Sequence, residues 1–498
     1  MVQSLAATGL GLTYPIQNVL AADGTPTREG VRVNPESRRL ERLIDRTPRE
    51  QCPLMLVEQH RKGVPYRELL AGAFLYALLR DGHHSVYIAH SSHQLSLDVP
   101  SQDRLLPLVW AVDVMKEHLT RFKKSEVQPL AGKFPSDESA LADFHSAMEA
   151  MDREKAEHAI IMLARSLGPR QAYGLLLPYA IRDNHFIGHI PIAVVNAGRV
   201  LDVIGWHHAE PVLRYIVRDM YRQPHSLDKQ PYVHNVERVA ASHDRLPADW
   251  SSSRSDPAST KQLYAQIAKG KWWNSNEWIV DRMSLGSLHA GSVWDAIHLT
   301  AANLMIRMKL GGNRLGNLAL HSNTSSSALH HVFRTSLDSR LRLVTMFQAV
   351  SWVTEFTLGE SNRNFLRDRD ILDLQPTTLD NNDSDSVQEI FDQLPPRVVR
   401  QEIHDRSGQD KAAELAFRVA SRPTGVDALL SRTRDSMCRK LTLDTHEMKY
   451  PIAMFEELQR VHPVWRPHLW AATVQYLQGS QSIDNPAVAL ADDAMKTS

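Results

Sequence analysis

Histidines gather in five short clusters along this sequence, which contains 24 of them. Histidine is the side chain that binds metal ions most often, and its pKa lies near neutral pH. The clusters read GHHSVYIAHSSH, RDNHFIGHIPI, GWHHAEPVLR, LHSNTSSSALHH and DTHEMKY. Buried imidazoles need polar partners, and one shared metal ion would serve several of them at once. The clusters together favour a metal site, although any single histidine is more often an ordinary core or surface residue.

The first two clusters have helical spacing. The first contains His83, His84, His90 and His93. A helix would place His90 and His93 on one face. In the second, His185 and His189 are four residues apart, which allows two imidazoles to bind one ion from one helical turn. Without an accompanying glutamate, this pair does not match the zinc-protease pattern.

The third and fourth clusters combine histidines with other polar residues. They contain His207, His208 and Glu210, and His321, His330 and His331. Pro211 indicates the first turn of a helix after the third cluster. The small hydroxyl residues that follow His321 leave room for a ligand, but such runs are also typical of loops and helix caps.

The fifth cluster places a cation beside an imidazole. His446 and Lys449 are three residues apart, so a helix would bring them to the same face. A protonated lysine repels a metal ion, and an isolated pair of this kind is usually a solvated surface pair. The other clusters decide whether this pair belongs to a site.

Composition excludes several other classes of protein. Lys plus Arg and Asp plus Glu both number 57, whereas a protein that grips nucleic-acid backbones needs a basic excess. Cys52 and Cys438 form no zinc-ribbon or C-x-x-C pattern. The sequence has no G-x-S-x-G elbow and no P-loop. No apolar run approaches the roughly 20 residues that span a bilayer, so we expect no nucleic-acid partner and no integral membrane segment.

Apolar residues at intervals of three and four predict helices through most of the chain. The clearest segments are 66–81, 104–122, 155–168, 208–221, 293–310, 340–356 and 465–477. Residues 84–92 fit either a strand or a buried helix. Polar stretches at 222–262 and 358–387 indicate long surface excursions. We expect a mainly α fold, with a single large multi-helix domain at 35–478 that encloses a metal-centred cavity.

Both ends of the chain are expected to lie outside this domain. Residues 1–22 end in Val-Leu-Ala after a small and apolar stretch, which is typical of a signal peptide that has lost its basic start. We therefore expect a bacterial protein that is exported to the periplasm or the extracellular space. If this segment is not a signal peptide, the expected localisation is the cytoplasm. Residues 479–498 are expected to form a flexible tail.

Several of these segments resemble the questin oxidase-like family, and in particular its exported bacterial members. The matching pieces are HHSVYIAHSSH, IGHIPIAVVNAGRVLDVIGWHHAEPVLR, VWDAIHLTAANLMIR, LHSNTSSSALHH and HEMKYPIAMFEEL, within residues 65–475. The family consists of helical oxygenases that open or oxidise aromatic polyketide rings such as anthraquinones. The resemblance implies a non-haem Fe(2+), O2 as co-substrate, and a small aromatic substrate.

The resemblance also implies a ligand set. The implied metal ligands are His84, with His93 as a competitor, His189, His208, His321 and Lys449. Lys449 would act as a lysine carboxylated on its amine, which supplies the negative charge that neutral imidazoles lack. The further histidines His83, His90, His185 and His207 leave the choice of ligands open.

Candidate acid–base or supporting residues are Glu210, Asp295 and His446. Trp206 and Trp294 are candidates for an aromatic pocket, although tryptophans are more often plain core. The expected chemistry is ring cleavage or oxygen insertion at an electron-rich ring carbon. The alternatives are a zinc or other metal-dependent hydrolase on the same scaffold and a non-catalytic helical binding protein. The expected partners are a small aromatic substrate and, in a homodimer, a second copy of the chain.

Overall fold

The structure is a computed structural model that describes residues 33–125, 137–182, 187–221, 230–309, 315–358, 366–374, 383–396 and 405–497. The predicted signal segment 1–22 and His185 lie outside the described residues, as does the side chain of His83. Throughout the described ranges the regular elements are helices, and the one β-bridge joins Met308 and Leu366. The prediction of a mainly α fold is confirmed. No described helix is long and apolar enough to cross a membrane.

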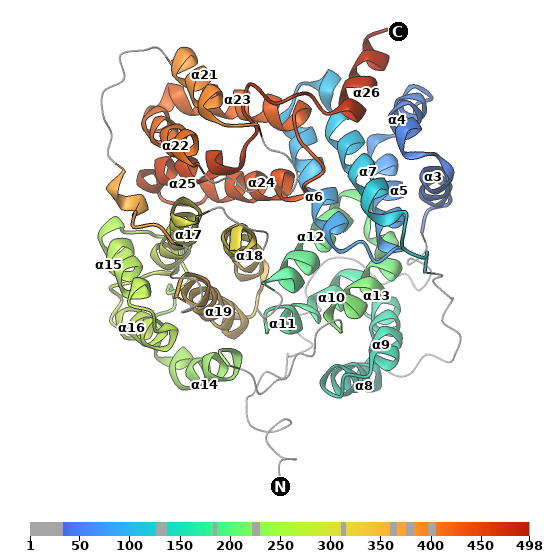
Figure 1. Ribbon diagram of the computed structural model, residues 1–498. Helices are drawn as coiled ribbons and strands as arrows, with labels where there is room; N and C mark the ends of the chain where they lie inside the picture. Colours follow the sequence, from blue (N-terminus) through green and yellow to red (C-terminus); the bar gives the residue numbers. More distant parts are fainter. Residues whose placement is uncertain are drawn as a thin grey trace. The chain divides into compact units, whose positions relative to one another are not determined.

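Contacts within the chain divide it into two compact units, and the expected domain at 35–478 covers parts of both. The first unit comprises residues 1–229 and 486–498, and the second comprises residues 230–485. Both units are built from helices (Figure 1).

The first unit is built from short and medium helices. In chain order they are α3 (Pro35–Arg46), α4 (Cys52–Arg61), α5 (Tyr66–Leu78), α6 (His83–Asp98), α7 (Leu106–Leu119), α8 (Asp137–Glu149), α9 (Arg153–Ser166), α10 (Pro169–Gly174), α11 (Leu177–Ala180), α12 (His189–Ile204), the 3-10 turn η3 (Trp206–His208), α13 (Ala209–Met220) and α26 (Pro486–Lys496). Helix α6 packs against α5, α7 and α12. Its residues Val86, Tyr87 and Ile88 are fully buried, which resolves the ambiguous segment 84–92 as a buried helix.

The C-terminal residues differ from the expected flexible tail. Helix α26 packs against α4 and α7 within the first unit. Its Val488 and Ala491 are buried, three residues apart on one face. These two residues form the apolar stripe of a short amphipathic helix.

The second unit contains the longer helices. They are α14 (Tyr232–Ser242), α15 (Pro257–Ala268), α16 (Trp272–Ser284), α17 (Ala290–Arg307), α18 (Leu315–Thr335), α19 (Ser339–Leu358), α21 (Asp383–Gln393), α22 (Ser407–Ala420), α23 (Pro423–Arg439), α24 (His446–Leu458) and α25 (Arg466–Thr473). Helix α18 packs against α17, α19 and α24, and α25 packs against α17 and α24 (Figure 1). Helices α17, α18 and α24 therefore meet in the core of this unit.

Part of the predicted surface excursion at 222–262 is also helical. Helix α14 buries Val236 and Val239, which are again three residues apart. Asn235 is fully buried and donates to Gln348 Oε1 at 2.8 Å, so a polar side chain holds the helix to α19. The polar composition of the segment concealed this narrow apolar face. Of the other excursion, 358–387, residues 359–365 and 375–382 lie outside the described ranges.

The serine- and threonine-rich run after His321 forms the middle of α18. Its side chains are buried, and Thr324 donates its hydroxyl to the backbone oxygen of Leu320 within the helix. Asn323 donates to the backbone oxygen of Ala301 on α17 at 2.9 Å. Small side chains allow close approach of neighbouring helices, so the run positions α18 between α17 and α24 rather than forming a loop.

Candidate metal centres

Three nitrogen-bearing side chains of the second unit converge where α18 meets the first turn of α24. We call His321, His446 and Lys449 the lysine cluster. The Nε2 atom of His321 lies 3.3 Å from Lys449 Nζ and 3.4 Å from His446 Nε2. His321 is 1% exposed and Lys449 is 3% exposed. The pair that looked like a surface pair in the sequence therefore lies in the protein core.

Asp444, two residues before the start of α24, orients His446. Its Oδ1 atom accepts from the backbone N–H of His446 at 3.0 Å and lies 2.7 Å from His446 Nδ1. Tyr476 donates its hydroxyl to the other carboxylate oxygen at 2.7 Å. Because a carboxylate accepts, we assign the imidazole proton to Nδ1. The lone pair of His446 Nε2 is then directed toward His321, as in the carboxylate–histidine pairs that support metal ligands.

Lys449 is a neutral amine for a large fraction of the time at neutral pH. Burial lowers the pKa of Lys449 to about 7, and the charge of Asp444 opposes this shift only in part. Burial acts in this direction because a buried ammonium ion loses its hydration. An unprotonated amine removes the repulsion between Lys449 and a cation.

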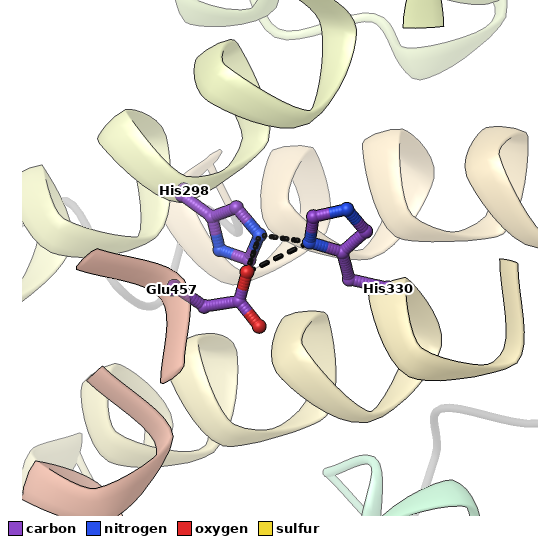
Figure 2. A group of neighbouring side chains, drawn as sticks. All are labelled: His298, His330 and Glu457. Carbon is purple, nitrogen blue, oxygen red and sulfur yellow. Dashed lines mark hydrogen bonds and ion pairs between the residues drawn. The ribbon is translucent and has the colours of Figure 1, made fainter. Parts of the chain in front are cut away.

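A second group of side chains, the glutamate cluster, consists of His298 on α17, His330 on α18 and Glu457 on α24 (Figure 2). The Oε2 atom of Glu457 lies 2.7 Å from His330 Nδ1 and 3.0 Å from His298 Nε2. The two imidazole nitrogens are 3.1 Å apart. All three residues are buried.

The neighbours of the glutamate cluster fix its orientation. Ser327 donates its hydroxyl to Glu457 Oε1 at 2.8 Å, and Arg460 donates to the same oxygen at 2.6 Å. The ring of Trp294 stacks on His330, with centroids 4.3 Å apart and planes 10° apart. One carboxylate oxygen is therefore occupied by donors, and the other faces the two imidazoles.

The charge states of the glutamate cluster suit a cation. Burial lowers the pKa of His330 to about 4, so its imidazole is neutral at neutral pH. Burial by itself would raise the pKa of Glu457, but the contacts with His298 and His330 hold it well below its ordinary value. The cluster thus presents a carboxylate and a neutral imidazole toward the same point.

The first unit brings two predicted ligands together. The ring centroids of His84 and His189 lie 5.2 Å apart, where α6 meets the start of α12. Tyr87 donates its hydroxyl to the backbone oxygen of His189 at 2.9 Å. His93 lies farther along α6, with its ring 5.8 Å from that of Tyr66. Burial, and to a smaller extent His90, lower the pKa of His93 to about 4.

His208 lies at the other end of α12 from His189. That helix is about 24 Å long, at a rise of about 1.5 Å per residue. His208 is fully buried beside the ring of His207, and its two ring nitrogens have no hydrogen-bond partner among the described residues. Burial lowers the pKa of His208 to about 4. The structure therefore does not bring His208 to the His84–His189 pair.

The predicted acid–base residues Glu210 and Asp295 already have partners. In the first unit, Glu210 pairs with Arg165 at 3.0 Å and Arg214 at 3.9 Å. In the second, Asp295 accepts from the hydroxyl of Ser255 and from the backbone N–H of His462. Burial raises the pKa of Asp295. Asp295 lies one helical turn before His298 on α17, so its immediate role is to hold the segments that flank the glutamate cluster.

Sequence reasoning missed the glutamate cluster as a unit. The fourth histidine cluster includes His330, but no local pattern marks His298 or Glu457 as ligands. His298 is the one histidine within α17, and Glu457 follows Glu456 near the end of α24, so no local spacing of ligands marks either residue. For His298, the available signal was its mostly apolar helix, because a buried polar side chain needs a partner.

Comparison with known proteins adds no assignment: no family model, no curated protein and no solved structure matches this chain.

Proposed function

We propose that the protein is a non-haem iron-dependent oxygenase, with the lysine cluster at its metal centre. The observation that carries the proposal is the convergence of His321, His446 and Lys449 on one buried point, within 3.4 Å. The substrate class, an aromatic or polycyclic small molecule of the anthraquinone kind, rests on the resemblance of the sequence motifs to the questin oxidase-like family.

The donor set fits a divalent metal once Lys449 is carboxylated. The neutral amine nitrogen attacks the carbon of CO2, an N–C bond forms, one C–O π bond becomes an oxygen lone pair, and one proton is released from the nitrogen to solvent. The product is a carbamate with a single negative charge. Two neutral imidazoles and one anionic oxygen donor suit a first-row divalent ion such as Fe(2+). The lowered pKa of Lys449 supports this step, because only the unprotonated amine reacts.

The residues of the chain have separate tasks in this proposal. His321 from α18, and His446 and the carboxylated Lys449 from α24, would bind the ion. Asp444 holds His446 in the tautomer that presents Nε2, and Tyr476 fixes Asp444 in turn. Burial keeps bulk water away from all three ligands. Iron held by these residues would supply redox chemistry toward O2.

Metal loading of Lys449→Met tests the proposed centre. Methionine keeps the length of the side chain and removes the nucleophilic amine. We expect purified wild-type protein to contain iron and this variant to lose it from the lysine cluster. The matched control is Lys116→Met, which alters another buried lysine, one that donates to the backbone oxygen of Ile44. Equal iron content in wild type and Lys449→Met would refute the role of Lys449.

Oxygen consumption tests the proposed activity. The iron-loaded protein would be mixed with hydroxylated anthraquinones, with and without a reduced nicotinamide as electron donor. Substrate-dependent O2 uptake that is lost in His321→Ala supports an oxygenase. A fully iron-loaded protein that consumes no O2 with any of these compounds under either condition counts against the proposed reaction and substrate class.

A further inference from the structure

We propose that the glutamate cluster is a second metal site. It would bind one divalent first-row transition ion through His298 Nε2, His330 Nδ1 and Glu457 Oε2. This inference is independent of the proposed function, because it uses different residues and requires no modified side chain.

The size of the cluster matches a set of metal ligands. Its three donor atoms form a triangle with sides of 2.7, 3.0 and 3.1 Å. Metal bonds of about 2.1 Å place neighbouring donors roughly 3.0 Å apart around an octahedral ion and roughly 3.4 Å apart around a tetrahedral one. The triangle therefore has the dimensions of one face of a coordination shell before any ligand moves.

Hydrogen bonds alone satisfy this triangle poorly. A neutral imidazole carries one N–H, so each ring presents either a hydrogen or a lone pair toward the other two atoms. Two N–H groups directed at Glu457 Oε2 would crowd at an N–N distance of 3.1 Å. One lone pair in place of an N–H would face the carboxylate oxygen without a proton between them. A cation removes both conflicts, because all three atoms then present lone pairs to it.

The surroundings prepare Glu457 to bind through a single oxygen. Ser327 and Arg460 occupy Oε1, which leaves Oε2 for the ion. Trp294 fixes the plane of His330 by stacking on it. Supporting contacts of this kind set the orientation of metal ligands in proteins.

The chemistry of the donor atoms limits which ions the site is expected to bind. Two imidazoles and one carboxylate are the ligands of many non-haem iron and zinc sites, in which further positions stay open to water or another small ligand. Calcium and magnesium prefer shells made of oxygen. We therefore assign the site to iron(II), zinc or a similar first-row ion.

The two clusters are too far apart to share one ion. His321 and His330 are separated by about 13 Å along α18, at about 1.5 Å per residue. Metal ions that act together in two-metal sites lie about 3.5–4 Å apart. The clusters would bind one ion each, so the second unit is expected to bind two.

Titration of metal-free full-length protein with Co(2+), in buffer equilibrated with CO2, tests this inference. Cobalt reports its nitrogen and oxygen ligands through its visible absorption spectrum. We expect Glu457→Gln to lose one of two bound ions, or to bind it at least about 100-fold more weakly, because Gln removes the charge at nearly unchanged shape. His298→Gln should do the same and serves as the second variant if Glu457→Gln does not fold. His331→Gln, which alters the neighbouring position on α18, is the matched control and should bind as wild type does.

The two proposals fail in different ways in this experiment. Loss of an ion in Glu457→Gln and His298→Gln but not in Lys449→Met supports the glutamate site, even if the lysine cluster binds nothing. A folded wild-type protein that binds no ion, or glutamate-cluster variants that bind as many ions as wild type with equal affinity, overturns the inference. Circular dichroism of each variant confirms that the fold is intact.

Discussion

The lysine cluster and the glutamate cluster both draw side chains from α18 and α24, with His298 of α17 added to the glutamate cluster, yet the buried ionisable group has opposite charge properties in the two clusters. At the glutamate cluster, Glu457 is surrounded by Ser327, Arg460 and two imidazoles and stays ionised. At the lysine cluster, the neighbours of Lys449 include His321 at 3.3 Å, and burial dominates its titration. One helix pair thus supports a buried anion at one end and a buried neutral amine at the other.

This difference decides what each cluster needs in order to bind a metal. The glutamate cluster already presents an anionic oxygen between two imidazoles, so a cation can bind without covalent change. The lysine cluster presents three nitrogens and gains an anion only if Lys449 reacts with CO2. Metal binding at the lysine cluster should therefore depend on CO2, whereas binding at the glutamate cluster should not.

The largest expected effect is the loss of stability when the carboxylate of the glutamate cluster is removed. In metal-free protein, Glu457→Ala removes the buried carboxylate that contacts Ser327, Arg460 and two imidazoles, and it should destabilise the fold by about 3–5 kcal/mol. Urea unfolding followed by circular dichroism measures this change. A loss below about 1 kcal/mol would mean that the ionised Glu457 is not a structural element of the core.

A substitution at the lysine cluster is expected to stabilise the fold instead. In metal-free, CO2-depleted protein at pH 7, Lys449→Met should stabilise the fold by up to about 4 kcal/mol, because burial disfavours the ammonium by about 1.36 kcal/mol per unit of pKa. The same urea experiment applies. An unchanged or lower free energy of unfolding in Lys449→Met would show that burial of the Lys449 amine does not destabilise the fold.

A smaller effect is expected when the support of His446 is weakened. Asp444→Asn keeps an acceptor for the backbone N–H of His446 but removes the negative charge beside Nδ1. Affinity for iron at the lysine cluster should fall about 10- to 100-fold, as for other residues that orient metal ligands. Equilibrium titration measures this change, and ion binding at the glutamate cluster is the internal control. Equal weakening at both clusters would indicate a general disturbance of α24.

The smallest expected effect is a difference between wild type and Lys449→Met in how the free energy of unfolding changes with pH. The pKa of Lys449 is about 7 in the folded protein and near 10.5 when unfolded. Between these values the unfolded state binds more protons, so stability from this group rises with pH; below pH 7 it no longer changes. Between pH 7 and 9, the free energy of unfolding of metal-free wild type should rise by up to about 1.4 kcal/mol per pH unit relative to Lys449→Met. Parallel curves would contradict the lowered pKa.

Local patterns in the sequence predicted the mainly α fold and part of one candidate site. Apolar spacing identified helices such as α17 and α19, and the three-residue spacing of His446 and Lys449 placed both on one face of a helix. His321 was selected through a family resemblance, and the structure brings it to that pair. The proposal that His84, His93, His189 and His208 bind the same ion as His321 and Lys449 stays a prediction, since these residues are divided between the two units.

The glutamate cluster and the charge state of Lys449 were decided by the tertiary structure alone. His298, His330 and Glu457 come from three helices and meet only because α17, α18 and α24 pack together. The amphipathic pattern of a helix tells which face is buried but not which residue of another helix it will contact. Burial also sets the pKa of Lys449, whereas the spacing of His446 and Lys449 taken alone indicates a solvated surface pair. Sequence spacing specifies neighbours within a helix, whereas helix packing specifies the partners and charge states from which both candidate centres are built.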